Sequence, residues 1–265
     1  MRKFLVLLAL FTSILLLNAC ENTNNGDYVI LPNLDKMTRS EIDQKMANLD
    51  VVVRYHFVKK SYQDESEYDQ FVYYGDDLKA GKRVNVGSTV HIYTTALHLP
   101  TENVVNLTMN LEYEGKDFIT DGVGRVTLAR AVDGDTAHFY TSDGTYIKVR
   151  FLGVDTPEST MDKEAWGKAA SNFTRNMLNN ASVIVLEREG QVKDSYGERY
   201  LAFVWCDGVL MNLQLVQNAY SNAKLSSSSK YYDAFFDTEM VISATGRRIW
   251  GEIDPGYDYD RHTFK

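Results

Sequence analysis

Two short acidic segments and one arginine stand out because together their side chains could hydrolyse a phosphate ester. The segments are Val-Asp-Gly-Asp-Thr at 132–136 and Asp-Thr-Pro-Glu at 155–158, and Arg150 lies between them. Carboxylate oxygens bind a hard divalent cation, a free carboxylate accepts a proton from water, and arginine stabilises charge on phosphate oxygens. Each segment alone is typical of a solvated turn or a helix start, so the hypothesis rests on their combination.

A β-hairpin between the two segments would bring their acids together. The intervening Ser-Asp-Gly-Thr at 142–145 contains Asp-Gly, a strong signal for a tight turn between antiparallel strands. If this turn is tight and unbulged, Ala137 pairs with Arg150 and Asp135 pairs with Leu152. Asp135 and Arg150 then become diagonal neighbours, about 7–8 Å apart, on one face. The second acidic segment begins just past this strand, so carboxylates from both segments come to one end of the hairpin.

Carboxylates gathered in one place raise one another's pKa unless a cation lies among them. Calcium fits this role because it prefers several oxygen ligands, including backbone carbonyls, and needs no cysteine or histidine. The chain has only Cys20 and Cys206, and its five histidines show no metal-ligand spacing, so a zinc or thiolate site is not indicated. The residues therefore predict a hard divalent cation as cofactor, and Ca²⁺ suits such a site.

Longer motifs carry a resemblance to a known family. Val-Arg-Phe-Leu-Gly-Val-Asp-Thr-Pro-Glu stands at 149–158, Asp-Ser-Tyr-Gly-Glu-Arg-Tyr-Leu-Ala-Phe at 194–203, and Ile-Trp-Gly at 249–251. With these motifs, residues 122–251 resemble the staphylococcal nuclease, or thermonuclease, family. The resemblance implies an α+β fold, namely a five-stranded OB-fold barrel with three helices. It also implies a calcium-dependent endonuclease that cleaves DNA and RNA to 3′-phosphate products.

The resemblance also implies a role for each matching residue. Asp135 and Asp155 match the family's metal-binding carboxylates, and Thr156 matches a residue that binds the metal through its backbone carbonyl. Arg150 matches the first catalytic arginine, which contacts the phosphate, and Glu158 matches the proposed general base.

The second phosphate arginine is shifted along the chain. The family reads Tyr-Gly-Arg-x-Leu-Ala, whereas this chain reads Tyr-Gly-Glu-Arg-Tyr-Leu-Ala at 196–202. Arg199 keeps the spacing to Leu-Ala and is the predicted catalytic arginine, and Glu198 is interpreted as a one-residue insertion. Tyr196 keeps a matching position for substrate binding, while a turn or core role for it stays open. The family's tyrosines are missing from the loop at 224–229, and the nearest tyrosines are Tyr231 and Tyr232. This predicts that base stacking there is either weaker or moved.

The elements that must position these residues follow a barrel-like pattern. From residue 123, short strand-like segments alternate with amphipathic helical ones, which is typical of an α+β domain built on a small barrel. The predicted strands lie at 126–129, 137–140, 146–154, 183–186 and 201–205, and the predicted helices at 162–180, 209–218 and 229–246. The sequence thus predicts a thermonuclease-like domain over residues 123–265.

A second, smaller α+β unit is predicted over residues 28–95. Its pattern is a proline-containing strand, a helix with Thr38 or Ser40 as its cap, and strands at 51–55, 71–74 and 81–93. This order resembles the PASTA domain, which implies contact with peptidoglycan, and a plain spacer is the alternative. Residues 96–122 are interpreted as a connector with strand-like segments at 104–111 and 117–120.

The first residues predict export. Arg2 and Lys3 precede an apolar run at 4–17 that is shorter than the ~20 residues needed to span a bilayer, a pattern typical of a secretory signal. A short buried helix is the alternative.

The end of this segment resembles the lipobox of bacterial lipoproteins, with Leu-Asn-Ala-Cys at 17–20. The resemblance implies a signal peptide over residues 1–19 and lipidation of Cys20. Residues 20–27 are polar and turn-rich, which predicts a tether. We therefore expect a lipid anchor in the cell membrane and a protein that faces outside.

Composition limits what the chain can do elsewhere. It has 265 residues, a formal net charge of −8, 44% hydrophobic and 24% charged residues, as in a globular protein. The acidic balance argues against a non-specific duplex binder, so nucleic acid must be bound through a local basic site or a cation. We expect a monomer. Two alternatives stay open: a catalytically weak binder of single-stranded nucleic acid, and a cell-wall-binding lipoprotein.

Overall fold

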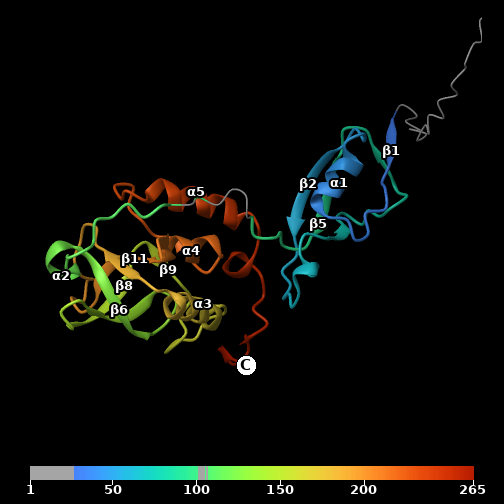
Figure 1. The fold of residues 1–265 in the computed structure, drawn as a ribbon. Helices are drawn as coiled ribbons and strands as arrows, with labels where there is room; N and C mark the ends of the chain where they lie inside the picture. The colour runs from blue at the N-terminus through green and yellow to red at the C-terminus, as the bar shows by residue number, and fades with distance from the viewer. Residues whose placement is uncertain (1–26, 101–104, 106) are drawn as a thin grey trace, which may run out of the picture.

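A computed structural model describes residues 27–100, 105 and 107–265 (Figure 1). The predicted signal peptide at 1–19, Cys20 and the tether up to residue 26 lie outside the described residues, so they stay predictions. Within the described ranges, no helix is long and apolar enough to cross a membrane.

The N-terminal unit, residues 27–100, has its own hydrophobic core. Its three-stranded sheet has the order β2-β5-β3, with β2 parallel and β3 antiparallel to β5, while β1 pairs with β4. Leu31, Ile42, Met46, Val90 and Ile92 are buried between helix α1 and this sheet. The elements are β1 (Tyr28–Ile30), α1 (Arg39–Met46), β2 (Val52–Phe57), a 3₁₀ turn (Glu65–Glu67), β3 (Phe71–Tyr74), β4 (Arg83–Asn85) and β5 (Thr89–Thr94).

Helix α1 begins at a capping box. Thr38 accepts a hydrogen bond from the backbone of Glu41, whose side chain accepts one from the backbone of Thr38. Of the two predicted caps, Thr38 is therefore the one used. The order of strands and helix agrees with the pattern expected from the sequence, except that Pro32 lies after β1 rather than within the strand. The resemblance to the PASTA domain stays a prediction.

A closed five-stranded barrel follows, which confirms the predicted fold class. The strand order is β10-β6-β7-β8-β11, and β10 also pairs with β11 to close the barrel. Buried side chains fill the interior, the largest being Phe139, Phe151, Phe203 and Trp205. The barrel strands are β6 (Val123–Ala131), β7 (Thr136–Thr141), β8 (Tyr146–Phe151), β10 (Ile184–Glu187) and β11 (Tyr200–Cys206).

Helices α3, α4 and α5 match the three predicted helices and lie against the barrel (Figure 1). Their bounds are α3 (Gly167–Asn180), α4 (Met211–Gln217) and α5 (Tyr232–Ser243). The short remaining elements are β9 (Val154–Asp155), β12 (Val209–Leu210), β13 (Asn222–Ala223), a 3₁₀ turn (Arg248–Trp250), β14 (Tyr257–Asp258) and β15 (Thr263–Phe264).

Helix α3 begins at Gly167 rather than at residue 162. Trp166 has a φ of 70°, in the left-handed region, which interrupts a regular helix. A Cβ atom on Gly167 would lie only 2.1 Å from the backbone oxygen of Glu158. Glycine therefore lets the start of α3 pack against the segment that carries Glu158.

The predicted strand at 117–120 is wrong. This stretch instead forms the short helix α2 (Phe118–Asp121). The side chain of Asp117 accepts hydrogen bonds from two backbone N–H groups of the first turn, and Gly122, with a φ of 78°, ends the helix. The described residues of the predicted strand at 104–111 form no strand either, although several of their apolar side chains pack on the barrel core.

The predicted hairpin exists, but its register differs by one residue. Thr136 pairs with Arg150 and Ala137 pairs with Val149, so the predicted pairing of Ala137 with Arg150 is wrong. The loop contains three residues, 142–144, and Gly144 has a φ of 86°. A two-residue loop would have given the predicted register, so the extra loop residue moves every pair by one.

The C-terminal segment, residues 244–265, contacts the N-terminal unit and lies between it and the barrel (Figure 1). The Tyr68 hydroxyl donates to Glu252 Oε1 at 2.7 Å, and the Arg247 guanidinium lies 4.1 Å from the centre of the Tyr68 ring. The backbone N–H of Leu97 donates to the oxygen of Thr245 at 2.9 Å. The N-terminal unit is therefore joined to the barrel domain by side chains as well as by the chain itself.

Candidate active site

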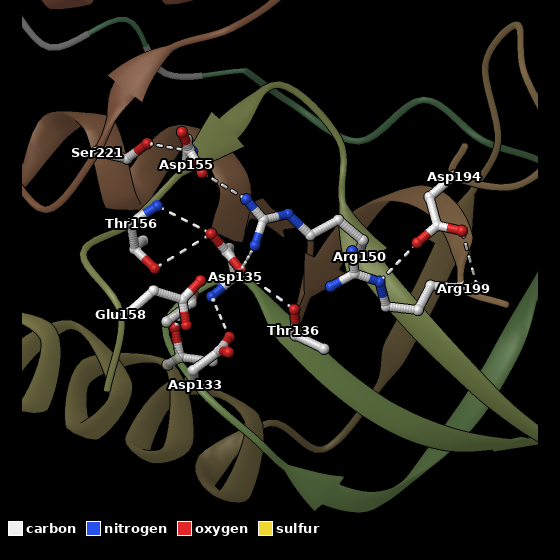
Figure 2. A network of polar contacts seen from close by, with 12 residues as sticks. Asp133, Asp135, Thr136, Arg150, Asp155, Thr156, Glu158, Asp194, Arg199 and Ser221 are labelled. Carbon is white, nitrogen blue, oxygen red and sulfur yellow. Dashed lines mark hydrogen bonds and ion pairs between the residues drawn. The ribbon is translucent and has the colours of Figure 1, made fainter. Parts of the chain in front are cut away.

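Asp135 is the buried centre of the candidate site (Figure 2). Its side chain is 1% exposed. Its Oδ2 accepts hydrogen bonds from the backbone N–H of Thr156 at 2.9 Å and from the Thr156 hydroxyl at 3.2 Å. Its Oδ1 accepts one from the Thr136 hydroxyl at 3.1 Å. The start of β7 and the end of β9 are thus joined through one carboxylate.

Arg150 on β8 bridges two acids that the sequence predicts to lie together. One of its terminal nitrogens donates to Asp135, and the other donates to Asp155 Oδ1 at 2.6 Å. Although the predicted register is wrong and Asp135 lies opposite Phe151, whose N–H donates to its backbone oxygen, the predicted neighbours still meet. Asp135 immediately precedes β7, so its side-chain direction is not fixed by strand alternation.

The site holds more negative charge than its cations balance. Burial raises the pKa of the Asp135 carboxyl to about 7, with Arg150 lowering it and Asp133 raising it further. The pKa of Glu158 is also raised, mainly by burial and then by Asp133. The single guanidinium of Arg150 therefore leaves an excess of negative charge among these carboxylates, which a bound cation would neutralise.

The predicted metal ligands offer hard oxygen donors. In the part of the chain that the structure describes, no group of three or more His, Cys, Asp or Glu side chains is arranged to hold a metal. The predicted set is different, since it combines Asp135 and Asp155 with the backbone carbonyl of Thr156. Oδ2 of Asp155 accepts no hydrogen bond from the described residues, and the Asp155 side chain is 55% exposed. This donor chemistry fits calcium, which completes its shell with water.

Glu158 lies on the loop that follows β9. Its backbone N–H donates to Glu164 Oε2 at 2.9 Å, and its backbone oxygen accepts from the N–H of Glu164 at 2.9 Å. The Glu158 carboxylate itself accepts no hydrogen bond from the described residues and is directed toward Asp133 and Asp135 (Figure 2). The backbone is therefore fixed, while the carboxylate is free to accept a proton.

Arg199 lies at the entry to β11, next to the bridging arginine's strand. Strand β11 runs parallel to β8, with Leu201 beside Arg150, so alternation places Arg199 on the same face of the sheet as Arg150. Arg199 Nε donates to Asp194 Oδ2 at 2.7 Å. Asp194 holds the arginine in place, which is a role that sequence spacing did not indicate.

The turn before Arg199 contains the other residues of interest. Glu198, the predicted insertion, makes an ion pair with Lys148 at 3.3 Å. Tyr196 is 83% exposed, so its ring is free of the core. An aromatic ring in this position is available to a ligand, and the substrate-binding role of Tyr196 stays a prediction.

Three further residues support the site and were not assigned roles from the sequence. Asp133 is 8% exposed, and its Oδ1 accepts from the N–H of Asp135 at 3.2 Å. The Ser221 hydroxyl accepts from the N–H of Asp155 at 2.8 Å. The side-chain oxygen of Asn222 is buried beside Asp155 without a hydrogen-bond partner among the described residues. Asp133 belongs to the acidic motif at 132–136. Ser221 and Asn222 approach Asp155 from a distant part of the sequence, so no local pattern indicates their role.

Replacing Ser221 with alanine tests the support of Asp155. The substitution leaves the N–H of Asp155 without its acceptor, so we expect the free energy of unfolding to fall by about 1–3 kcal/mol and calcium to bind more weakly. Urea denaturation and calorimetric calcium titration measure the two effects. The matched control is Ser243→Ala, at the end of α5, whose hydroxyl donates only to the backbone of its own helix at 3.3 Å. Equal calcium affinity in both variants would contradict the role given to Ser221.

Comparison with known proteins agrees with this geometry. The family model described as staphylococcal nuclease homologue matches residues 148–252. A thermonuclease of Staphylococcus hyicus is 30% identical over 166 residues, which cover 59% of this chain and 96% of that protein. A thermonuclease of Staphylococcus intermedius is 40% identical over 108 residues, which cover 40% of this chain. The SPbeta prophage-derived endonuclease YokF of Bacillus subtilis is 32% identical over 141 residues, which cover 51% of this chain and 46% of that protein.

The extent of these matches differs between the relatives. The chain covers 62% of the Staphylococcus intermedius protein but nearly all of the Staphylococcus hyicus one. The stretch that matches the family model, residues 148–252, includes Arg150, Arg199 and helices α3, α4 and α5. The chain therefore belongs to the staphylococcal nuclease family.

Proposed function

We propose that this protein is a calcium-dependent endonuclease that hydrolyses phosphodiester bonds of DNA, RNA or both to 3′-phosphate products. One observation carries the proposal: Arg150 contacts both Asp135 and Asp155, and the free Glu158 carboxylate lies beside them. Membership of the nuclease family and the names of the relatives support a hydrolase of the endonuclease class.

Each residue has a place in the proposed reaction. Asp135, Asp155 and the backbone carbonyl of Thr156 would hold calcium, which when bound orients and polarises the phosphate. Glu158 accepts a proton from the attacking water, and burial makes its carboxylate more basic by raising its pKa.

The two arginines act on the phosphate. Arg150 and Arg199 share one face of the sheet, and each guanidinium carries five N–H donors, of which the described contacts with carboxylates use only some. Their remaining donors can stabilise the charge that develops on the phosphate oxygens. Tyr196 is proposed to contact the substrate from the neighbouring turn.

The cellular setting is a separate part of the proposal. We propose, on the sequence of residues 1–20 alone, that the protein is exported, anchored by a lipid on Cys20 and directed outward from the cell membrane. The PASTA resemblance of residues 28–95 supports a contact with peptidoglycan, and the protein is proposed to act as a monomer. Retention of the full chain on purified peptidoglycan tests the wall contact, which no retention would contradict.

End-group analysis of cleaved oligonucleotides tests the proposed reaction. Labelled DNA and RNA are incubated with the full chain and calcium, and then with calcium removed by a chelator. We expect internal cleavage that leaves 3′-phosphate ends and stops on chelation. Binding of single strands without cleavage would instead favour the alternative of a catalytically weak nucleic-acid binder. The ion pair between Arg150 and the buried Asp135 supports that alternative, because such a pair can also have a purely structural role.

A further inference from the structure

A second groove lies beside the candidate active site, where the N-terminal unit meets the C-terminal segment. We call it the inter-unit groove; its volume is about 460 Å³, and its lining includes Lys59, Trp166 and Tyr259. Lys59 follows β2, so this residue comes from outside the part of the chain that matches the nuclease family model. The groove therefore combines a side chain of the N-terminal unit with side chains of the barrel domain and the C-terminal segment.

The inter-unit groove adjoins the active-site groove. The latter has a volume of about 370 Å³ and is lined by Asp155 and Glu158, among others. The two grooves have three lining residues in common, Pro157, Glu164 and Ile249, which form a shared wall. A ligand that occupies the active-site groove can therefore extend past this shared wall into the inter-unit groove.

Lys59 gives the inter-unit groove a free positive charge. It is exposed, and among the described residues it makes no ion pair with any carboxylate within 4.0 Å. Its stem passes close to Gly251, where a Cβ atom would lie 3.8 Å from Lys59 Cε. In a chain with a net charge of −8, an unpaired ammonium next to the candidate site is a local attraction for a phosphate.

Aromatic side chains give the inter-unit groove a surface for bases. Tyr259 is 47% exposed, and its hydroxyl accepts a hydrogen bond from the N–H of Asp254 at 2.9 Å. Trp166 is half-buried in the same lining. Proteins that bind single-stranded nucleic acid combine positive charge, which contacts the phosphates, with aromatic rings, on which any base can stack.

The wall of the groove is held in place before any ligand arrives. The Trp166 indole N–H donates to the backbone oxygen of Glu252 at 3.2 Å, and its backbone N–H donates to Asp254 Oδ2 at 2.6 Å. Glu252 also accepts from Tyr68 of the N-terminal unit. A groove built in advance binds without the cost of ordering its walls.

We propose that the inter-unit groove binds the single-stranded stretch of nucleic acid next to the scissile bond, with a phosphate at Lys59 and a base against Tyr259. This inference rests on the proposed nuclease function. Glu164, at the shared wall, repels phosphate, so the phosphate contact falls at the Lys59 end. The N-terminal unit thereby becomes part of the substrate-binding surface.

Kinetics of the full chain on short and long substrates test the proposal. KM is measured for a dinucleotide, which is too short to fill both grooves, and for a single-stranded dodecanucleotide. For Lys59→Ala we expect the KM of the dodecanucleotide to rise about three- to tenfold relative to the KM of the dinucleotide. For the dodecanucleotide, the slope of log KM against log salt concentration should weaken by about 0.7, as for one lost phosphate contact. Lys45→Ala, which removes an exposed lysine on α1, is the matched control and should behave as wild type.

A second pair of variants tests the stacking contact. Tyr259→Phe keeps the ring and loses the hydroxyl, whereas Tyr259→Ala loses both. We expect KM for the long substrate to rise in Tyr259→Ala and to stay near wild type in Tyr259→Phe. A merely structural role of the hydroxyl would impair both variants alike and would contradict the stacking contact.

The outcomes separate this inference from the proposed function. If wild type cleaves both substrates and Lys59→Ala has the same KM ratio and salt dependence, the groove does not bind substrate. If wild type cleaves neither substrate, the proposed function fails. The groove is then judged by the fluorescence anisotropy of a labelled dodecanucleotide, for which weaker binding by Lys59→Ala supports it and unchanged binding overturns it.

Discussion

Replacing Glu158 with glutamine is expected to slow phosphodiester cleavage by about 10²- to 10⁴-fold, because an amide does not accept the proton that the attacking water must lose. The fold should be unaffected. The Glu158 carboxylate accepts no hydrogen bond from the described residues, and the backbone contacts with Glu164 do not depend on the side chain. Single-turnover cleavage of a fluorogenic DNA at saturating calcium measures the rate of the chemical step.

The control for this variant is a glutamate of similar chemistry outside both grooves. Glu112→Gln changes an exposed glutamate in the segment before the barrel and should cleave at the wild-type rate. Circular dichroism of both variants confirms that they are folded. Equal rates for wild type and Glu158→Gln would exclude Glu158 as the base.

Replacing Arg150 with lysine is expected to lower kcat/KM by about 10²- to 10³-fold, the size of effect seen when a donor that stabilises transition-state charge is removed. Arg150 reaches Asp135 and Asp155 at once with two nitrogens of one planar group. A lysine offers a single ammonium, which cannot reproduce that fork. The substitution therefore disturbs both the phosphate contact and the position of the predicted metal ligands.

The same substitution should also lower stability. Asp135 is 1% exposed and Arg150 is 19% exposed, so the pair is largely shielded from water. A weakened partner for a buried carboxylate should reduce the free energy of unfolding by about 1–3 kcal/mol, which urea denaturation measures. Arg125→Lys, on the exposed side of β6, is the matched control. A kcat/KM within twofold of wild type would contradict the role of Arg150.

The meeting of Asp135, Arg150 and Asp155 could be predicted from the sequence because it depends on local features. An Asp-Gly turn, two strands of similar length and an acidic segment directly after the second strand bring these residues to one end of a hairpin whatever the exact pairing. The register depends on a finer feature, the left-handed conformation of Gly144, which adds one residue to the loop.

Other features could not be predicted because they depend on single caps or on contacts distant in the sequence. Helix α2 is so short that one side chain, Asp117, and one glycine decide between helix and strand. Ser221 supports Asp155 across 66 positions of the sequence. Asp194 is closer to Arg199, but its hydrogen bond depends on how the turn folds. Periodicity and motif spacing carry no information on such contacts.

The contact between the two units was also beyond the sequence. The patterns of residues 28–95 and of the barrel domain predict each unit separately. Nothing in those patterns pairs Tyr68 with Glu252 or brings Lys59 and Trp166 into one groove. These contacts form only when the C-terminal segment packs between both units. The inter-unit groove is therefore a property of the folded chain.

Calorimetric titration of calcium into the full chain tests most directly whether the end of the hairpin is a metal site next to the two arginines. We expect one calcium ion per chain for wild type and an affinity at least about tenfold weaker for Asp135→Asn and Asp155→Asn. Asp237→Asn, which changes an exposed acid on α5, should keep the wild-type affinity. Equal calcium affinity in all four folded proteins, or no calcium binding by wild type, would contradict the metal site.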